Sequence, residues 1–306
     1  MSYALKTAYT ELFSDTLTPI SLYLKVRDLY ANSLFFETTT ATNTYSFVGL
    51  KPIAHLCLNE GEKDFEMKFP DGKKITSAIE NASINTRNTL TENLKLFLEH
   101  FELIGTPKDH LTENRLLGYC KSDPKNPEII TEAYFTIYEY LIIMDHNHNQ
   151  TYIYGQSFND SQENLQQKIH QLSESVTYQS IPIYNFSNKA LHRTTTNTST
   201  TTKYHFRGDE FNVLRKLRSK FGTRECCFLD YGNYKLFGSS TYDQKKAENK
   251  TTTLVGSFNS QAKAHCSNTF NVIKSKNHYL DFSDILNKTS EFNTKENIEN
   301  LLNTIK

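Results

Sequence analysis

Short apolar runs bounded by turn-forming residues recur along the first part of the chain, and they predict β-strands. Such runs cover residues 33–38, 45–50, 56–58 and 65–69. Pro70-Asp71-Gly72 follows the last of them with residues that favour a tight turn. The pattern therefore predicts several strands joined by short connections.

A pair of runs rich in aromatic and β-branched residues predicts a β-hairpin near the middle of the chain. Its strands are residues 134–145 and 150–155, and Asp145 to Asn149 forms the loop. The loop contains His146 and His148, two residues that can bind a metal. Because nothing nearby in the sequence completes a ligand set, we interpret them as polar loop residues.

Helical spacing of apolar residues appears first after Thr18. Thr18 and Pro19 supply a hydroxyl cap and a proline in the first turn, and Leu22, Val26 and Leu29 then fall on one face. Similar patterns predict further helices over residues 90–101, 164–172, 209–218 and 294–305.

A change in composition divides the chain. Residues 194–202 are rich in threonine and contain nothing apolar to bury, so they predict a flexible linker. After it, the runs 226–229 and 234–237 predict a second hairpin. The predicted fold class is α+β, a mainly antiparallel sheet with flanking helices. The predicted parts are residues 1–190, a linker at 191–204, and residues 205–306.

Composition limits the classes of partner. The 306 residues carry 34 Lys+Arg and 34 Asp+Glu, so the formal charge is zero and no basic excess favours nucleic acid. The cysteines are five in number and lack CxxC spacing, which favours reduced thiols over a disulfide framework. Neither a signal peptide nor an apolar run long enough to span a bilayer is visible. We therefore expect a cytoplasmic protein without nucleic-acid or membrane partners.

Two segments resemble a known family. Residues 16–54 (TLTPISLYLKVRDLYANSLFFETTTATNTYSFVGLKPIA) are similar to the opening of anthranilate synthase component I, the large subunit of that enzyme. DEFNVLRKLR at 209–218 and FLDYGNYKLFGSS at 228–240 match later motifs of the family in the correct order. The resemblance implies conversion of chorismate to anthranilate with Mg2+, and ammonia from a glutamine amidotransferase subunit. It also implies tryptophan as a feedback effector.

The resemblance places an effector pocket on the Phe36-Glu37-Thr38 segment, which stands where the family has Leu-Glu-Ser, together with Tyr45 and Gly238. Glu37 is expected to hold an amino group through a charge-assisted hydrogen bond. The alternative is that Glu37 only ends an exposed strand.

The resemblance to the family's catalytic half rests on fewer residues. Gly256 and Ser257 correspond to the family's Ile-Ala-Gly-Thr element, and Glu296 and Glu299 echo its metal-binding helix. Carboxylates three residues apart share a helix face, and Mg2+ binds one or two such groups. The alternative for Glu296 and Glu299 is a solvated helix face.

Several departures from the family bear on activity. Phe206-Arg207-Gly208-Asp209 runs directly into the next motif, as if one strand were missing, so the second sheet is expected to be incomplete. Thr223-Arg224-Glu225 stands where the family has Ser-Pro-Tyr, and Thr241-Tyr242 replaces its Pro-Glu. The family's catalytic His and Gly-Ala-Pro-Lys stretch have no counterpart before Lys306.

Three functions remain open at this point. In the first, the resemblance implies that the chain is a component I of anthranilate synthase, and its activity is implied by the resemblance alone. Alternatively it is a relative that binds tryptophan or a partner without catalysis, or a gene fragment with no function of its own. The departures lead us to expect that this chain does not catalyse the reaction.

Overall fold

The described part of the chain forms two units. The computed structural model describes residues 2–39, 44–59, 61–62, 64–76, 87–105, 116–122, 129–184, 189–195, 201–207, 209–212, 214–215, 218, 225–231, 234–241, 252–259 and 268–273. Unit 1 comprises residues 1–33 and 43–180, and unit 2 comprises residues 34–42 and 181–306. The larger segment of unit 2 thus begins ten residues before the predicted linker, and unit 2 also includes residues 34–42 from the first part of the chain.

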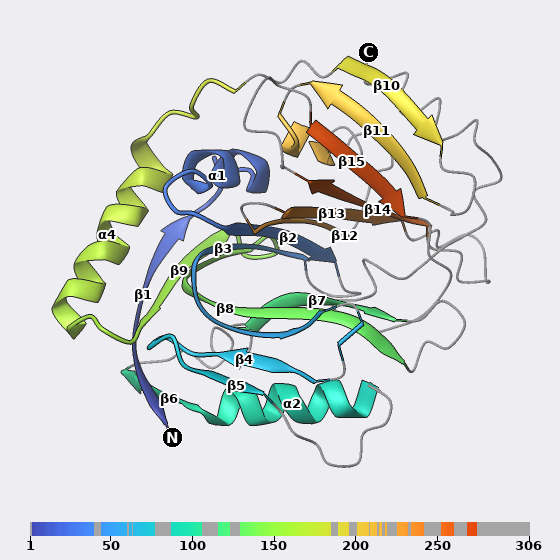
Figure 1. The fold of residues 1–306 in the computed structure, drawn as a ribbon. Coiled ribbons are helices and arrows are strands. Elements are labelled where there is room, and N and C mark those ends of the chain that lie inside the picture. Colours follow the sequence, from blue (N-terminus) through green and yellow to red (C-terminus); the bar gives the residue numbers. More distant parts are fainter. Residues whose placement is uncertain are drawn as a thin grey trace. The chain divides into compact units, whose positions relative to one another are not determined.

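Unit 1 is built on a mixed sheet (Figure 1). The strand order is β3-β8-β9-β1-β6, β4 and β5 continue from β3, and β7 pairs with β8. The pairing of β1 with β6 is parallel, whereas β8 is antiparallel to its neighbours β3, β7 and β9. The strands are β1 (Tyr3–Phe13), β3 (Thr44–Leu58), β4 (Glu66–Lys68), β5 (Lys74–Thr76), β6 (Phe101–Gly105), β7 (Leu116–Ser122), β8 (Ile130–Asp145) and β9 (Gln150–Ser157).

Strand β3 is longer than the sequence predicted. Residues 45–50 and 56–58 were expected to form separate strands, but both belong to β3. The strand continues because Lys51 adopts a positive φ of 57° and the pairing with β8 shifts register between Pro52 and Ala54. A bulge is one of the few places where a sheet accepts proline, which has no N–H to donate.

Three helices of unit 1 lie within its described residues: α1 (Pro19–Val26), α2 (Arg87–Glu99) and α4 (Gln162–Tyr178). The predicted cap of α1 is confirmed, since the Thr18 hydroxyl accepts a hydrogen bond from the Ser21 N–H at 3.1 Å. Helix α1 ends at Val26, however, so Leu29 lies outside it. Within the described residues, no helix combines the length and the apolar character needed to cross a membrane.

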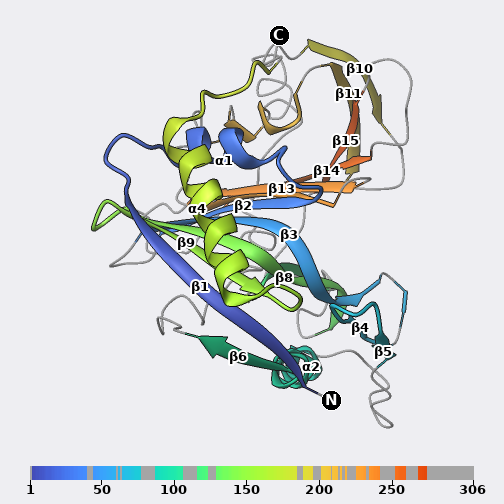
Figure 2. The same ribbon diagram turned by 90° about the vertical axis from the view of Figure 1, so that its left-hand side faces the viewer.

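Helix α4 covers one face of the sheet across β1 and β9 (Figures 1 and 2). Its inward face consists of the buried residues Leu165, Ile169, Leu172 and Val176, spaced as an amphipathic helix requires. The Lys25 ammonium of α1 donates to the Val176 carbonyl at 2.7 Å. A cation at this end satisfies a carbonyl that the helix leaves without a partner and complements the helix dipole.

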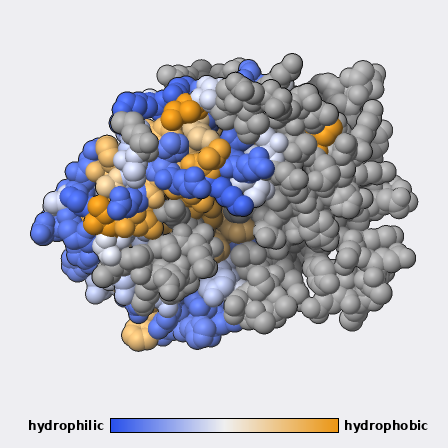
Figure 3. Space-filling model, turned by 90° about the horizontal axis from the view of Figure 1, so that it is seen from below, coloured by the Kyte–Doolittle hydropathy of each residue, from blue (hydrophilic) through white to orange (hydrophobic). Residues whose placement is uncertain are grey.

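An aromatic cluster packs between the start of β1, the turn after β4, helix α2 and strand β6. Tyr3 stacks on Phe69 with ring centroids 5.0 Å apart, and Phe97 and Phe101 complete the group. All four are at most 6% exposed. On the face that Figure 3 shows, hydrophobic patches lie among hydrophilic residues, as is usual for a protein surface.

Unit 2 has the strand order β10-β11-β15-β14-β13-β12-β2. Its strands are β2 (Ser33–Thr39, all but the first residue), β10 (Lys189–Thr195), β11 (Thr201–Arg207), β12 (Glu225–Asp230), β13 (Tyr234–Thr241), β14 (Thr252–Asn259) and β15 (Asn268–Ile273). The hairpin predicted at 226–237 is confirmed as the antiparallel pair β12–β13. The helix predicted at 294–305 lies outside the described residues.

The two described ends of the threonine-rich segment lie in strands, although the sequence predicted a flexible linker there. Thr194 and Thr195 belong to β10, and Thr201 and Thr202 belong to β11, which pairs with β10 in antiparallel register. Threonine is β-branched and fits an extended strand even where it buries little apolar surface. Backbone pairing therefore prevails here over polar composition.

A mixed sheet with few helices agrees with the predicted α+β class. That the sheet is mainly antiparallel, and that a second sheet is incomplete, both stay predictions.

Two glycines of unit 1 provide a test of how tightly its sheet is packed. A Cβ on Gly49 would lie 2.7–2.9 Å from ring atoms of Tyr138, a residue only 2% exposed. A Cβ on Gly155 would meet the Ile169 and Leu165 side-chain ends at 2.7–3.0 Å, and these rotate away more easily. We expect Gly49→Ala to lower the free energy of unfolding by about 2–3 kcal/mol and Gly155→Ala by about 1 kcal/mol. Urea denaturation measures the free energy of unfolding of both variants. A larger decrease in Gly155→Ala than in Gly49→Ala would contradict the tighter packing at Gly49.

Candidate functional site

Glu37 is the centre of the candidate site in unit 2. It lies in β2, is 7% exposed, and accepts two hydrogen bonds from the Arg218 guanidinium. The distances are 2.7 Å from Nε to Oε2 and 2.8 Å from Nη2 to Oε1. The Cys226 thiol donates a third hydrogen bond to Oε2, at 3.1 Å. Glu37 is thus buried and paired, and it does not simply end an exposed strand.

Hydrophobic packing brings Arg218 to Glu37. The described residues between 211 and 218 are helical, and the Asp209 carboxylate accepts the Phe211 N–H at 3.0 Å at the start of this turn. Phe211 is fully buried and meets Phe35 and Phe228 edge to face, at centroid distances of 5.6 and 5.3 Å. Because Phe35 precedes Glu37 by two residues on β2, the same docking presents Arg218 to the carboxylate.

The charges of the site balance one another. Burial lowers the pKa of Arg218, but the Glu37 carboxylate outweighs that effect and raises the pKa above its ordinary value. Burial raises the pKa of the Cys226 thiol well above its usual range, and the nearby Glu37 charge raises it further. The thiol therefore stays protonated and donates to Glu37, while the ion pair as a whole is neutral.

The two members of the pair differ in exposure. The Glu37 side chain is 9% exposed, whereas the Arg218 side chain is 39% exposed. A bound amino group would have to share a carboxylate that already accepts three hydrogen bonds. The charge that a ligand meets first in this site is therefore the guanidinium. The expected role of Glu37 as the acceptor of an amino group stays a prediction.

The remaining residues of the predicted effector pocket fall on several elements. Phe36 is 5% exposed, and its side chain points to the opposite face of β2 from Glu37 because neighbouring strand residues alternate. Thr38 follows in β2, and Gly238 lies in β13 opposite Cys227. Tyr45 is the second residue of β3 in unit 1 and packs near Phe47 at a centroid distance of 6.2 Å.

The predicted catalytic and metal residues are placed only in part. Gly256 and Ser257 lie in the middle of β14, where Gly256 pairs with Phe237 and Val272. Glu296 and Glu299 lie outside the described residues. The assignment of these four residues to catalysis and Mg2+ stays a prediction.

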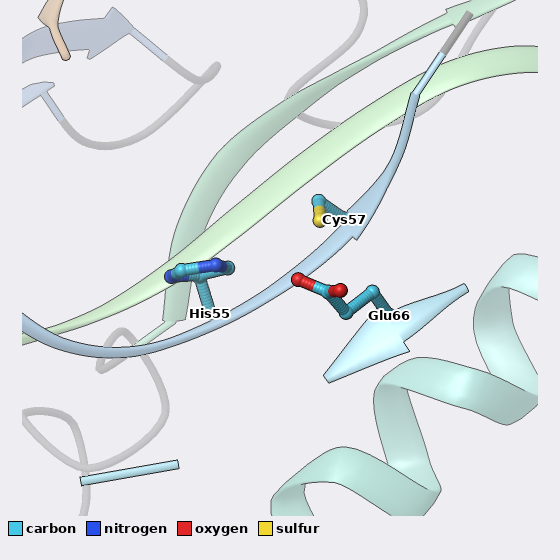
Figure 4. Close-up of side chains that lie close together, drawn as sticks. All are labelled: His55, Cys57 and Glu66. Carbon is cyan, nitrogen blue, oxygen red and sulfur yellow. The ribbon is translucent and has the colours of Figure 1, made fainter. Parts of the chain in front are cut away.

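A second group of reactive side chains lies in unit 1 and was not found from the sequence. The ligand atoms of His55, Cys57 and Glu66 all lie within 4.8 Å of one another (Figure 4). Burial, and then the charge of Lys68, lower the pKa of His55 to about 4. Burial, and then the charge of Glu66, raise the pKa of Cys57 to about 11. The only sequence signal was a histidine and a cysteine two residues apart in a predicted strand region.

Comparison with known proteins finds similarity to solved structures, at low identity and low TM-score. No protein-family model and no curated protein matches the chain. Anthranilate synthase component I from Streptococcus pneumoniae TIGR4 aligns at 13% identity and a TM-score of 0.42, over 80% of this chain and 59% of that one. MenF, the menaquinone-specific isochorismate synthase from Escherichia coli, aligns at 8% identity and 0.41, over 83% of this chain. The chain spans only 59% and 54% of the lengths of these two proteins.

The ion pair predicts an asymmetry between two substitutions. Arg218→Met leaves a buried carboxylate without its cation, whereas Glu37→Gln leaves a guanidinium that is partly in water. Removing one partner of a buried pair is costly, and the cost falls with exposure. We expect Arg218→Met to lower the free energy of unfolding by about 2 kcal/mol and Glu37→Gln by about 1 kcal/mol.

Urea denaturation midpoints measure this order, and Arg215→Met on the same helical segment is the matched control. The control should lower the free energy of unfolding by less than Arg218→Met does, because the Arg215 Nη1 donates a hydrogen bond of 3.4 Å to an uncharged acceptor, Asn212 Oδ1. Equal losses in Arg218→Met and Glu37→Gln would show that burial of the carboxylate does not set the cost.

Proposed function

We propose that this chain is an anthranilate synthase component I-like protein of tryptophan biosynthesis whose described part binds tryptophan and does not by itself convert chorismate. The motifs at residues 16–54 and 206–240 support the relation to that family. The single observation that carries the binding function is the Glu37–Arg218 ion pair, which lies on the segment matching the family's effector strand.

The geometry of the pair suits the carboxylate of an amino acid. Glu37 holds the guanidinium through Nε and Nη2, so Arg218 is already oriented before a ligand arrives. An oriented guanidinium loses little conformational entropy on binding and recognises carboxylates well. The partly exposed side of Arg218 is thus the proposed site of the tryptophan carboxylate, with Glu37 as the group that positions it.

The absence of catalysis is proposed from individual residues. Thr241-Tyr242 stands where the family has Pro-Glu, so a family carboxylate is replaced by neutral side chains. Mg2+ is held by carboxylates together with substrate oxygens, and catalytic electrostatics requires all such groups in place. An interaction with a glutamine amidotransferase subunit is part of the same proposal.

Fluorescence anisotropy of tryptophan tests the binding function directly. The chain contains no tryptophan, so excitation at the red edge of indole absorption reports the ligand alone. We expect a saturable rise in anisotropy as protein is added. Because the exposed charge is a cation, indole-3-propionate should also bind, whereas tryptamine, which lacks the carboxylate, should bind at least about tenfold more weakly.

Variants locate the binding to the ion pair. Arg218→Met should weaken tryptophan binding by at least about tenfold, and Arg215→Met should leave it unchanged. Glu37→Gln keeps the cation but not its orientation, so an intermediate loss is expected. Binding of tryptamine as strong as that of tryptophan, or no saturable signal at all, would contradict the proposal.

A separate assay tests catalysis. The purified chain is incubated with chorismate, Mg2+ and an ammonium salt, and anthranilate is followed by its fluorescence. We expect no product above the rate in buffer. A clear signal that depends on Mg2+ would show instead that this chain is an active component I.

A further inference from the structure

Three side chains of different chemistry meet on one face of the β3–β4 pair. His55 and Cys57 are two residues apart in β3, so their side chains point to the same face. Glu66 of β4 pairs directly with Cys57 and extends between the other two side chains (Figure 4). Imidazole nitrogen, thiol sulfur and carboxylate oxygen therefore converge, with all three atoms within 4.8 Å of one another.

We propose that His55, Cys57 and Glu66 bind a Zn2+ ion, with a water molecule in the fourth position. Thiolate and imidazole ligands favour zinc and similar transition metals over Mg2+ or Ca2+. A thiolate and a carboxylate also balance the two positive charges of the ion, since the imidazole is neutral. The Cys57 proton passes to solvent when the ion binds.

Only a small contraction is needed to close the site. Tetrahedral zinc with ordinary bond lengths holds its ligand atoms about 3.3–3.8 Å apart, and here the separations reach at most 4.8 Å. Glu66 is half-buried and has three rotatable side-chain bonds, so its carboxylate can approach without backbone movement. Cys57 is 6% exposed and stays fixed in β3.

The neighbours of the cluster fit this role. Tyr134 of β8 stacks on the His55 ring at 5.1 Å and orients it. The Lys74 ammonium lies 2.9 Å from Oε1 of Glu66 and 3.0 Å from Oε2. One carboxylate oxygen can bind the ion while the other keeps this lysine. Lys74 is 56% exposed and can also move into solvent.

The ion would join β3 to the hairpin of β4 and β5. That hairpin is short, and the three residues of β5 are all exposed. A bound ion that recognises only the folded chain stabilises it in proportion to its occupancy. The proposed ion would thus stabilise the hairpin against β3, and it would keep one position open to an exchangeable water.

The experiment measures metal bound to the full chain after loading with Zn2+ and buffer exchange. Elemental analysis should give one ion per chain, and Zn2+ but not Mg2+ should raise the thermal midpoint by several degrees. Co2+ in place of zinc should give the intense visible bands of a four-coordinate ion, with a sulfur-to-cobalt charge-transfer band.

Single substitutions identify the ligands. Cys57→Ser, His55→Gln and Glu66→Gln should each weaken Zn2+ binding by about a hundredfold, and Cys57→Ser should abolish the charge-transfer band. Glu66→Gln keeps the test valid if a variant of a more buried ligand fails to fold, because a half-exposed position tolerates this change. Circular dichroism will show that the variant is folded. His170→Gln on the exposed face of α4 and the double variant His146→Gln, His148→Gln are controls that should bind normally.

Several results would overturn the assignment. These are a stoichiometry near zero, unchanged binding in Glu66→Gln, or a cobalt spectrum without the thiolate band. Loss of binding in the His146→Gln, His148→Gln variant with normal binding in Cys57→Ser would move the ion to the hairpin loop. None of these results depends on whether the chain binds tryptophan.

Discussion

The long antiparallel ladder between β3 and β8 determines the geometry of unit 1. It runs from the pair Tyr45–Asp145 to the pair Leu58–Ala133, while β7 and β9 divide the other edge of β8 between them. A slip of one residue would turn every side chain of β8 to the opposite face. The buried Glu139 restricts this further. Its carboxylate meets the Lys51 ammonium at 2.7 Å, and Lys51 stands where β3 bulges. The bulge is therefore part of what satisfies a buried charge.

Among the residues whose burial the structure describes, two glutamates are buried, one in each unit, and they are neutralised in the same manner. The Glu139 side chain is 6% exposed and its lysine 43%, and the Glu37 side chain is 9% exposed and its arginine 39%. In each case a long cationic side chain keeps its charged end near water while the carboxylate lies inside, which limits the desolvation cost to one partner. The difference is in geometry: Arg218 presents two separate N–H groups, from Nε and Nη2, to the two carboxylate oxygens and its planar group is held in one orientation, whereas the single Lys51 Nζ lies 2.7 Å from both oxygens of Glu139. That difference is why Arg218, rather than Lys51, suits a ligand carboxylate.

What could be predicted from the sequence depended on how local the cause was. The Thr18 cap, the 134–155 hairpin and the strand at 33–38 follow from nearby residues, and all three were predicted. The continuity of β3 through Lys51 and Pro52 could not be predicted, because it depends on pairing with β8 and on a bulge. Strands β10 and β11 were not predicted at the threonine-rich segment, because its polar composition is typical of a linker although threonine favours strands. The Glu37–Arg218 contact joins residues 181 positions apart. No local pattern contains that information.

The polar cluster around Glu37 and the polar cluster around Cys57 differ in the kind of ligand that their side chains can bind. Around Glu37, the guanidinium and the thiol supply hydrogens to one carboxylate, so the charge of that carboxylate is balanced within the protein. Around Cys57, three groups that can donate electron pairs converge, and the cations nearest to them are lysines on the exposed side of the hairpin. The imidazole and the thiol are neutral and the Glu66 carboxylate is paired with Lys74, so a metal ion would take the place of the thiol proton and share the carboxylate with this lysine. A ligand can therefore reach the Glu37 cluster only through the partly exposed Arg218. The His55, Cys57 and Glu66 cluster can instead bind an ion between its three ligand atoms.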